Sequence, residues 1–306
     1  MKKLGFWIKL LGVILFFLLI YNVGWQETFK SIKKTSLWYL LGSLPIIWLG
    51  HYLKSLRWRL VSHSYGISLG FYEAFKIFSI GLFLANITPG KVGDFARLYY
   101  IKDKLPNRKI GWSSLIMDRI FDLICLVLFS LCALLYYQIQ FEIVEKLSNH
   151  GSVIWLISIT MVIVLLVFVF RDKIRKFTGS WWIAFNAHTL LGYKGIWAFS
   201  LTFVSMTLLY GVFNFLAWGM GIHIDQLGLF LGVFVVGILS LLPITVLGLG
   251  VREVSLVMIF SLYTLAPEDA IALSVIVFFV QLISLFPGAI WFYLSPVRLH
   301  DFRRSQ

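Results

Sequence analysis

The chain has 306 residues, of which 59% are hydrophobic and only 13% are charged. A soluble domain carries about 25% charged residues, so this composition and a mean hydropathy of +0.87 exclude an ordinary soluble protein. The formal net charge of +13 is explained in a membrane protein by basic cytoplasmic loops and anionic headgroups. No nucleic-acid-binding motif accompanies it, so nucleic acid is not an expected partner.

Apolar stretches of about 20 residues, the length of helix that crosses the hydrocarbon of a bilayer, recur along the chain. In chain order they cover residues 5–23, 37–54, 112–137, 153–170, 196–218 and 270–294. We therefore predict an all-α integral membrane protein with about six full transmembrane helices, in which residues 1–306 form a single polytopic domain.

Two further apolar segments, residues 71–101 and 228–265, are interrupted by proline and glycine. These residues stop helices, and irregular backbone at membrane depth is tolerated only where protein or water surrounds it. The arm after the first break has about 10 residues, or about 15 Å of helix, which is too short to cross about 30 Å of hydrocarbon. We predict two oppositely directed re-entrant hairpins, a possible inverted repeat. The break residues are Asn86, Thr88, Pro89, Gly90 and Gly93 in the first hairpin and Pro243, Gly248 and Gly250 in the second.

Loop charge predicts the orientation, because Lys and Arg favour the cytoplasmic side. Basic residues follow the first hairpin and recur in residues 171–195, for which we predict an amphipathic helix in the cytoplasmic interface. The first hairpin is then expected to enter from the cytoplasm and the second from outside. We expect both termini in the cytoplasm and the protein in the plasma membrane. Three lysines of the first outer loop do not fit this rule: Lys30, Lys33 and Lys34.

Each break is followed by the start of a helix that carries charged residues. A helix start presents unpaired N–H groups and the positive end of its dipole, so two starts meeting near the midplane predict a site for an anion such as a lipid phosphate. The alternative is that the carboxylates only stabilise their own helix starts, with the arginines as ion partners. The expected substrate-binding residues are Lys91, Asp94 and Arg97 at the first break and Arg252 and Glu253 at the second.

A third charged group lies near one end of the span at residues 112–137. Asp118 and Asp122 are one turn apart on one helix face, and Arg119 reaches Asp122 at i+3. Two interpretations stay open, an interfacial salt-bridge group or a set of counter-charges for the substrate site. Arg57 and Arg59, at the end of the second span, are expected to anchor it at the interface.

No nucleophile elbow, P-loop, Cys/His cluster or metal-ligand spacing occurs in the sequence. An enzyme is therefore the weaker class, and we expect no cofactor and no metal. Three functions remain as candidates: a lipid translocator, a membrane enzyme that acts on a lipid phosphate, and a non-transporting membrane partner of a glycosyltransferase.

Three sequence blocks, in order, resemble the lysylphosphatidylglycerol synthase transmembrane-domain family. Residues 86–97, N-I-T-P-G-K-V-G-D-F-A-R, resemble the family's N-x-[ST]-P-G-x-x-G-[ED]-x-x-R block. Residues 118–122, D-R-I-F-D, resemble its [ED]-R-x-x-D block. Pro243 with residues 248–253, G-L-G-V-R-E, is similar to its P-x(n)-G-x-G-x-x-E block. Asp94 stands where many relatives carry Glu.

This resemblance implies a flippase-like module that covers essentially the whole chain. In the best-known members it moves a lipid with a modified headgroup between leaflets, and other members are thought to handle polyprenyl-linked sugars. The resemblance does not extend to the soluble aminoacyl-transferase domain of the two-domain synthases, so aminoacyl-lipid synthesis is not expected. The expected partners are membrane lipids, a phosphate-bearing lipid substrate, and a lipid-modifying enzyme or glycosyltransferase.

Overall fold

The computed structural model describes residues 25–88, 93–141, 192–240 and 250–295. Every regular element in these ranges is helical, which confirms the predicted all-α class. In chain order the elements are α2 (Trp25–Lys33), α3 (Leu37–Ser64), α4 (Phe71–Ile87), α5 (Ala96–Tyr100), the short 3-10 helix η2 (Lys102–Lys104), α6 (Arg108–Phe141), α11 (Tyr193–Gly219), α12 (Gln226–Leu239), α13 (Val251–Leu262), α14 (Pro267–Ser284) and α15 (Phe286–Leu294).

Three helical segments in the described ranges are long and apolar enough to cross a membrane. They run Arg108–Gln140, Tyr193–Gly219 and Pro267–Leu294, and contain the predicted spans 112–137, 196–218 and 270–294. The predicted span 37–54 lies inside α3, which has 28 residues but is not among these three. The spans predicted at 5–23 and 153–170, and the interfacial segment up to residue 191, lie outside the described residues.

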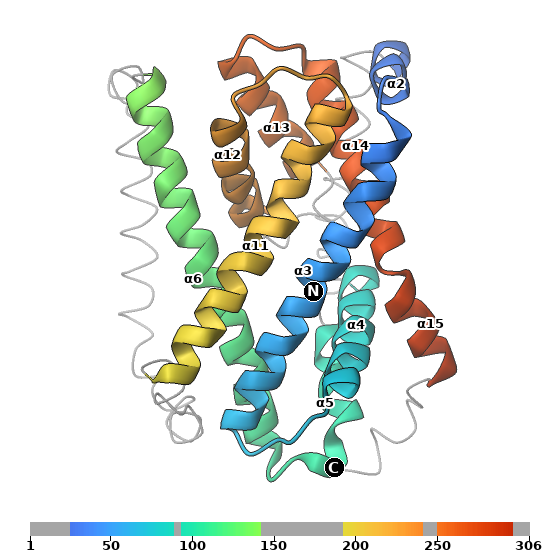
Figure 1. Ribbon diagram of the computed structural model, residues 1–306, viewed down its shortest axis with the longest axis vertical. Helices are drawn as coiled ribbons and strands as arrows, with labels where there is room; N and C mark the ends of the chain where they lie inside the picture. Colours follow the sequence, from blue (N-terminus) through green and yellow to red (C-terminus); the bar gives the residue numbers. More distant parts are fainter. Residues whose placement is uncertain (1–24, 89–92, 142–191, 241–249, 296–306) are drawn as a thin grey trace, which may run out of the picture.

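Long and short helices take different places in the bundle. Helices α3, α6 and α11 run along its long axis, and α14 continues into α15 along the same axis (Figure 1). Helices α4 and α5 lie in the lower half of this view, and α12 and α13 lie in the upper half. Proline at the second position of α15 marks the junction with α14, because proline cannot continue the hydrogen-bond ladder of a helix. The short pairs therefore occupy opposite ends of the molecule.

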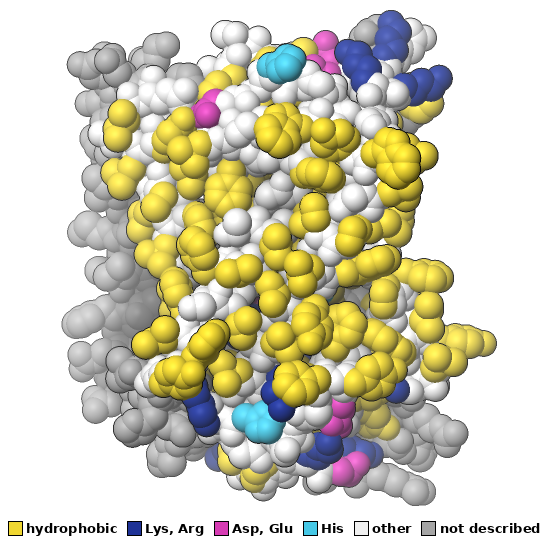
Figure 2. All heavy atoms as spheres, in the orientation of Figure 1, with side chains coloured by type: hydrophobic (Ala, Val, Ile, Leu, Met, Phe, Trp, Pro, Cys, Tyr) yellow, Lys and Arg dark blue, Asp and Glu magenta, His cyan; other side chains and the backbone are white. Residues whose placement is uncertain are grey.

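The core packs in two main apolar clusters that correspond to these two ends. One joins α11, α12, α13 and α14 around Leu216, Leu229, Phe260 and Leu273. The other joins α3, α4 and α6 around Trp58, Phe78 and Met117, among other side chains. The outer surface is apolar through the middle of the face in Figure 2, with charged side chains gathered toward the two ends. This distribution is the one expected of a protein that faces hydrocarbon around its waist.

Candidate functional site

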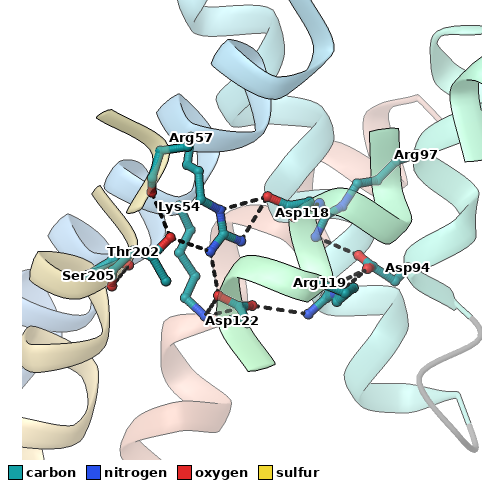
Figure 3. A network of polar contacts seen from close by, with 10 residues as sticks. Lys54, Arg57, Asp94, Arg97, Asp118, Arg119, Asp122, Thr202 and Ser205 are labelled. Carbon is teal, nitrogen blue, oxygen red and sulfur yellow. Dashed lines mark hydrogen bonds and ion pairs between the residues drawn. The ribbon is translucent and has the colours of Figure 1, made fainter. Parts of the chain in front are cut away.

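A network of charged side chains lies between α3, α6 and the turn that leads into α5 (Figure 3). It combines four cations with three carboxylates, and Thr202 of α11 adds a hydroxyl. Five of the predicted site residues belong to it, together with two that sequence reasoning did not assign to a site. The charged members of this network, called the charged network below, are Lys54, Arg57, Asp94, Arg97, Asp118, Arg119 and Asp122.

Arg57 ties three helices together at the centre of the charged network. Its Nε donates to Asp118 Oδ1 at 2.8 Å, and its Nη1 donates to Asp122 Oδ1 at 2.5 Å and to Thr202 Oγ1 at 3.1 Å. The residue is 0% exposed. The prediction that Arg57 anchors α3 at the interface is therefore wrong. Asp118 and Asp122 are one turn apart, so both present a carboxylate to the same guanidinium.

Arg97 is fully buried between two carboxylates and two aromatic rings. Its Nη2 lies 2.5 Å from Asp94 Oδ1, and its Nη1 lies 3.4 Å from Asp118 Oδ2. The guanidinium carbon lies 4.2 Å from the ring centroid of Phe78, which adds a cation–π attraction. The close approach requires a glycine on α4, since a Cβ built at Gly81 would lie 2.6 Å from Arg97 Cγ.

Arg119 and Lys54 close the charged network on its two sides. Arg119 Nε donates to Asp94 Oδ2 at 3.0 Å, and its Nη2 pairs with the same oxygen. Its Nη1 lies 3.7 Å from Asp122 Oδ2, so the predicted i,i+3 pair of Arg119 with Asp122 forms an ion pair without a hydrogen bond. Lys54 Nζ lies 3.1 Å from Asp122 Oδ1. The Arg119 side chain is 44% exposed, against 14% for Lys54.

The charges of the charged network do not balance. Among the described residues, four cations against three carboxylates leave one positive charge. Removing a charge from water costs several kcal/mol unless a counter-charge and hydrogen bonds replace the solvent, so this arrangement favours the binding of one more anion. A planar guanidinium can donate two parallel N–H hydrogen bonds to two oxygens of one phosphate.

A second polar group lies at the start of α13 and against α14. Glu253 Oε2 accepts the Gly250 backbone N–H at 2.6 Å, and Glu253 Oε1 accepts the Ser274 hydroxyl at 2.6 Å. Arg252 Nε donates to Ser274 Oγ at 2.7 Å, and Arg252 Nη2 lies 3.4 Å from Glu253 Oε1. Arg252 also reaches Gln281 Oε1 at 3.4 Å. This pair is buried and electrically balanced.

The structure therefore describes two groups where the sequence predicted one anion site between two helix starts. Among the described residues, the polar partners of Arg252 all belong to α13 and α14. Glu253 caps its own helix start, and Asp94 pairs with the arginine one turn later. Both contacts agree with the alternative interpretation given above, in which the two carboxylates stabilise their own helix starts and the arginines are their ion partners.

The described part of the first break is closed by hydrogen bonds near the end of α4. Thr88 Oγ1 donates to Leu84 O at 2.6 Å and accepts the Gly93 N–H at 2.7 Å, while Asn86 Nδ2 donates to Leu82 O at 2.8 Å. A Cβ at Gly93 would lie 2.2 Å from Leu84 O, so only glycine fits. The predicted residues outside the described ranges are Pro89, Gly90, Lys91, Pro243 and Gly248.

A third polar group, around Asp225, lies at the end of the bundle opposite α5. Tyr136 and Tyr263 donate hydroxyl hydrogens to Asp225 Oδ2 at 2.5 and 3.2 Å. Asp225 also accepts the N–H groups of Leu227 and Gly228, which caps the start of α12. Partial burial raises the pKa of this carboxyl, but the hydrogen bonds from Tyr136, Gly228 and Tyr263 outweigh burial and hold the pKa below its usual value.

Within the described ranges, no three His, Cys, Asp or Glu side chains come together as metal ligands. Sequence reasoning missed Lys54 and Arg57, although their i,i+3 spacing puts both on one face of α3. Two cations on one helix face were the sequence signal for a polar contact, and this face of α3 is the one that meets Asp118 and Asp122.

Comparison with known proteins gives one family and three similar chains. The family model described as "Lysylphosphatidylglycerol synthase TM region" matches residues 6–288. A UPF0104 membrane protein of Pyrococcus horikoshii is 27% identical over 184 residues, which are 56% of this chain and 52% of the relative. A UPF0104 membrane protein of Methanocaldococcus jannaschii is 27% identical over 150 residues, 47% of this chain and 44% of the relative. A second one from the same organism is 25% identical over 70% of this chain and 94% of its own length. The matched part thus spans about half the length of the first two relatives, and no solved structure matches.

Proposed function

This chain belongs to the lysylphosphatidylglycerol synthase transmembrane-region family, and we propose that it moves a phosphate-bearing lipid between the leaflets of the plasma membrane. The substrate class is a modified phospholipid or a polyprenyl-phosphate-linked sugar. The carrying observation is the surplus positive charge of the charged network, which lies inside a helical membrane protein.

Intramembrane charge supports a transport role because it is costly in hydrocarbon and usually marks a substrate or ion pathway. Two of the four cations, Arg57 and Arg97, are 0% exposed. The surplus positive charge of the whole charged network favours an anion, and a lipid phosphate has the charge and the geometry for two-point binding to a guanidinium. Asp94, Asp118 and Asp122 limit the surplus to a single charge, so the phosphate is not trapped.

The arrangement of the short helices supports access from two sides. Helix α4 has 17 residues and α12 has 14, or about 26 and 21 Å of helix, both short of about 30 Å of hydrocarbon. The α4–α5 and α12–α13 pairs lie at opposite ends of the bundle (Figure 1). We interpret them as re-entrant hairpins from the cytoplasmic and the outer side, with both chain termini in the cytoplasm.

The test compares two variants that each remove one positive charge from the same end of the molecule. Arg97→Gln removes a buried cation of the charged network, whereas Lys104→Gln removes a cation that is 45% exposed and pairs with Glu73. The assay measures how fast headgroup-labelled phosphatidylglycerol, or a labelled polyprenyl phosphate, becomes accessible across reconstituted vesicles. Removing one partner of a desolvated charge pair costs about 2–5 kcal/mol, so Arg97→Gln should translocate at least tenfold more slowly at about 1.4 kcal/mol per factor of ten.

Lys104→Gln should translocate lipid at the rate of the unmodified protein. If Arg97→Gln folds poorly, Arg97→Lys tests whether a positive charge at this position is enough for transport. Equal rates for Arg97→Gln and Lys104→Gln would remove the charged network from the transport path. No translocation of either lipid by well-folded protein would favour the alternatives, a membrane enzyme acting on a lipid phosphate or a non-transporting partner of a glycosyltransferase.

A further inference from the structure

One cation of the charged network faces out of the bundle while the others face in. The side chains of Arg57 and Arg97 are 0% exposed and that of Lys54 is 14% exposed, but the Arg119 side chain is 44% exposed. A guanidinium has five N–H donors. Two nitrogens of Arg119 point to Asp94, and Nη1 lies 3.7 Å from Asp122, beyond hydrogen-bond distance. Arg119 therefore keeps donors for a ligand that arrives from outside.

The position of Arg119 along α6 fixes its depth relative to lipid. It directly precedes residues 120–137, an apolar run whose single charged residue is Asp122. Eighteen residues of helix measure about 27 Å, close to the thickness of the hydrocarbon layer at about 30 Å. Arg119 consequently lies where the hydrocarbon begins, at the level of the phosphates of one leaflet.

The surroundings of Arg119 resemble a binding surface for a whole lipid. Ile116, Leu123 and Val127 share its helix face at i−3, i+4 and i+8 and are 38, 47 and 41% exposed. On the headgroup side, Phe95 packs against Trp112 with ring centroids 4.6 Å apart, and aromatic rings of this kind are typical of the membrane–water interface. Acyl chains can lie along Leu123 and Val127 while the phosphate reaches Arg119.

We propose that this surface, formed by Phe95, Trp112, Ile116, Arg119, Leu123 and Val127, is a lateral lipid portal. An anionic phospholipid binds there through its phosphate before it enters the bundle, and its acyl chains stay in the membrane. Asp94 links the portal to the interior, because it pairs with Arg119 on one side and with buried Arg97 on the other. The role of the portal in transport rests on the proposed function, but lipid binding at the portal can be measured without transport.

The test uses a bimane label at a single cysteine and lipids with brominated acyl chains, which quench the label on contact. Leu123→Cys carries the label in a Cys132→Ala background, because Cys132 is exposed whereas Cys125 is buried. Leu135→Cys is the matched control, since Leu135 is 61% exposed on the same helix about 18 Å further along. Brominated phosphatidylglycerol should quench the Leu123 label at about fivefold lower mole fraction than brominated phosphatidylcholine, with no preference at the Leu135 label.

Arg119→Gln should abolish this preference and Arg119→Lys should keep most of it. Equal quenching by the two lipids at Leu123, or a preference that survives in Arg119→Gln, would overturn the portal. If the glutamine variant fails to fold, the comparison of the two labels in protein with Arg119 intact still decides. Translocation without a preference at Leu123 would refute the portal alone, and a preference without translocation would refute the proposed transport alone.

Discussion

Arg57→Ala tests whether the charged network holds the helices together. Arg57 is 0% exposed and contacts Asp118, Asp122 and Thr202 at 2.5–3.1 Å. Breaking a buried ion pair by removing one partner costs about 3–5 kcal/mol, because a buried charge is left uncompensated. Here each carboxylate keeps another cation, Arg97 at 3.4 Å from Asp118 and Lys54 at 3.1 Å from Asp122. We therefore expect a loss near the lower limit, about 3 kcal/mol of unfolding free energy.

Arg59→Ala is the matched control, two residues further along α3. Arg59 is partly exposed, donates to Leu69 O at 2.8 Å and lies 3.8 Å from the ring centroid of Phe71, contacts worth about 1 kcal/mol together. Reversible unfolding in mixed micelles, followed by circular dichroism, measures both. In addition, Arg57→Ala with Asp118→Asn should cost less than the sum of the single changes. A loss for Arg57→Ala no larger than for Arg59→Ala would refute the structural role of the charged network.

Two further predictions concern packing and orientation. Gly81→Ala should lower the unfolding free energy by about 1–3 kcal/mol, because the added Cβ would lie 2.6 Å from the fully buried Arg97. Gly211→Ala, whose added Cβ would have no atom within 4 Å, should be neutral or stabilising in the same unfolding assay. Single cysteines beside Lys104 and beside Glu268 should react with an impermeant maleimide from opposite sides of the membrane, the first from the cytoplasm, and labelling from one common side would refute the hairpin orientation.

The sequence predicts the helical class well because hydropathy depends on composition and length. The three apolar segments within the described ranges contain the predicted spans 112–137, 196–218 and 270–294. The pairs Asp94–Arg97 and Arg119–Asp122 follow from their i,i+3 spacing. Arg57 is different. Its interior position depends on which side of α3 meets α6 and α11. Near the end of a span, an arginine can point either to the membrane interface or into the bundle. Only tertiary packing distinguishes the two.

The predicted single anion site also needed information that spacing does not contain. Helix starts at the two breaks have similar charges, so the sequence alone suggested one shared site. In the structure Arg252 donates hydrogen bonds to Ser274 and Gln281 on α14. Glu253 neutralises the charge of Arg252 in an ion pair. These partners come from a helix that follows α13, and no local pattern around Gly250 indicates them. Neutral Arg252–Glu253 has no surplus charge, so the attraction for an anion concentrates in the charged network.

The charged network combines a rigid part and an accessible part, and this division bears on how a lipid could pass. Arg57 uses its donors on α6 and α11, so it positions the helices and has little capacity for a moving ligand. Arg119 is exposed and shares Asp94 with Arg97. A phosphate that bound the remaining donors of Arg119 would share this guanidinium with Asp94 and weaken their attraction, so that Asp94 would shift toward Arg97. Binding at the portal would then strengthen the interior pair, and a transfer of phosphate toward Arg97 would have to displace Asp94 a second time. Asp94 pairs with both arginines, and Asp94→Asn keeps the shape of the side chain but removes its charge. In the translocation assay this variant should bind phosphate more tightly at Arg119 and should also pass it inward faster, because no carboxylate is left to displace from Arg97. Unchanged or slower translocation by Asp94→Asn would refute a role of Asp94 as a competitor of the phosphate.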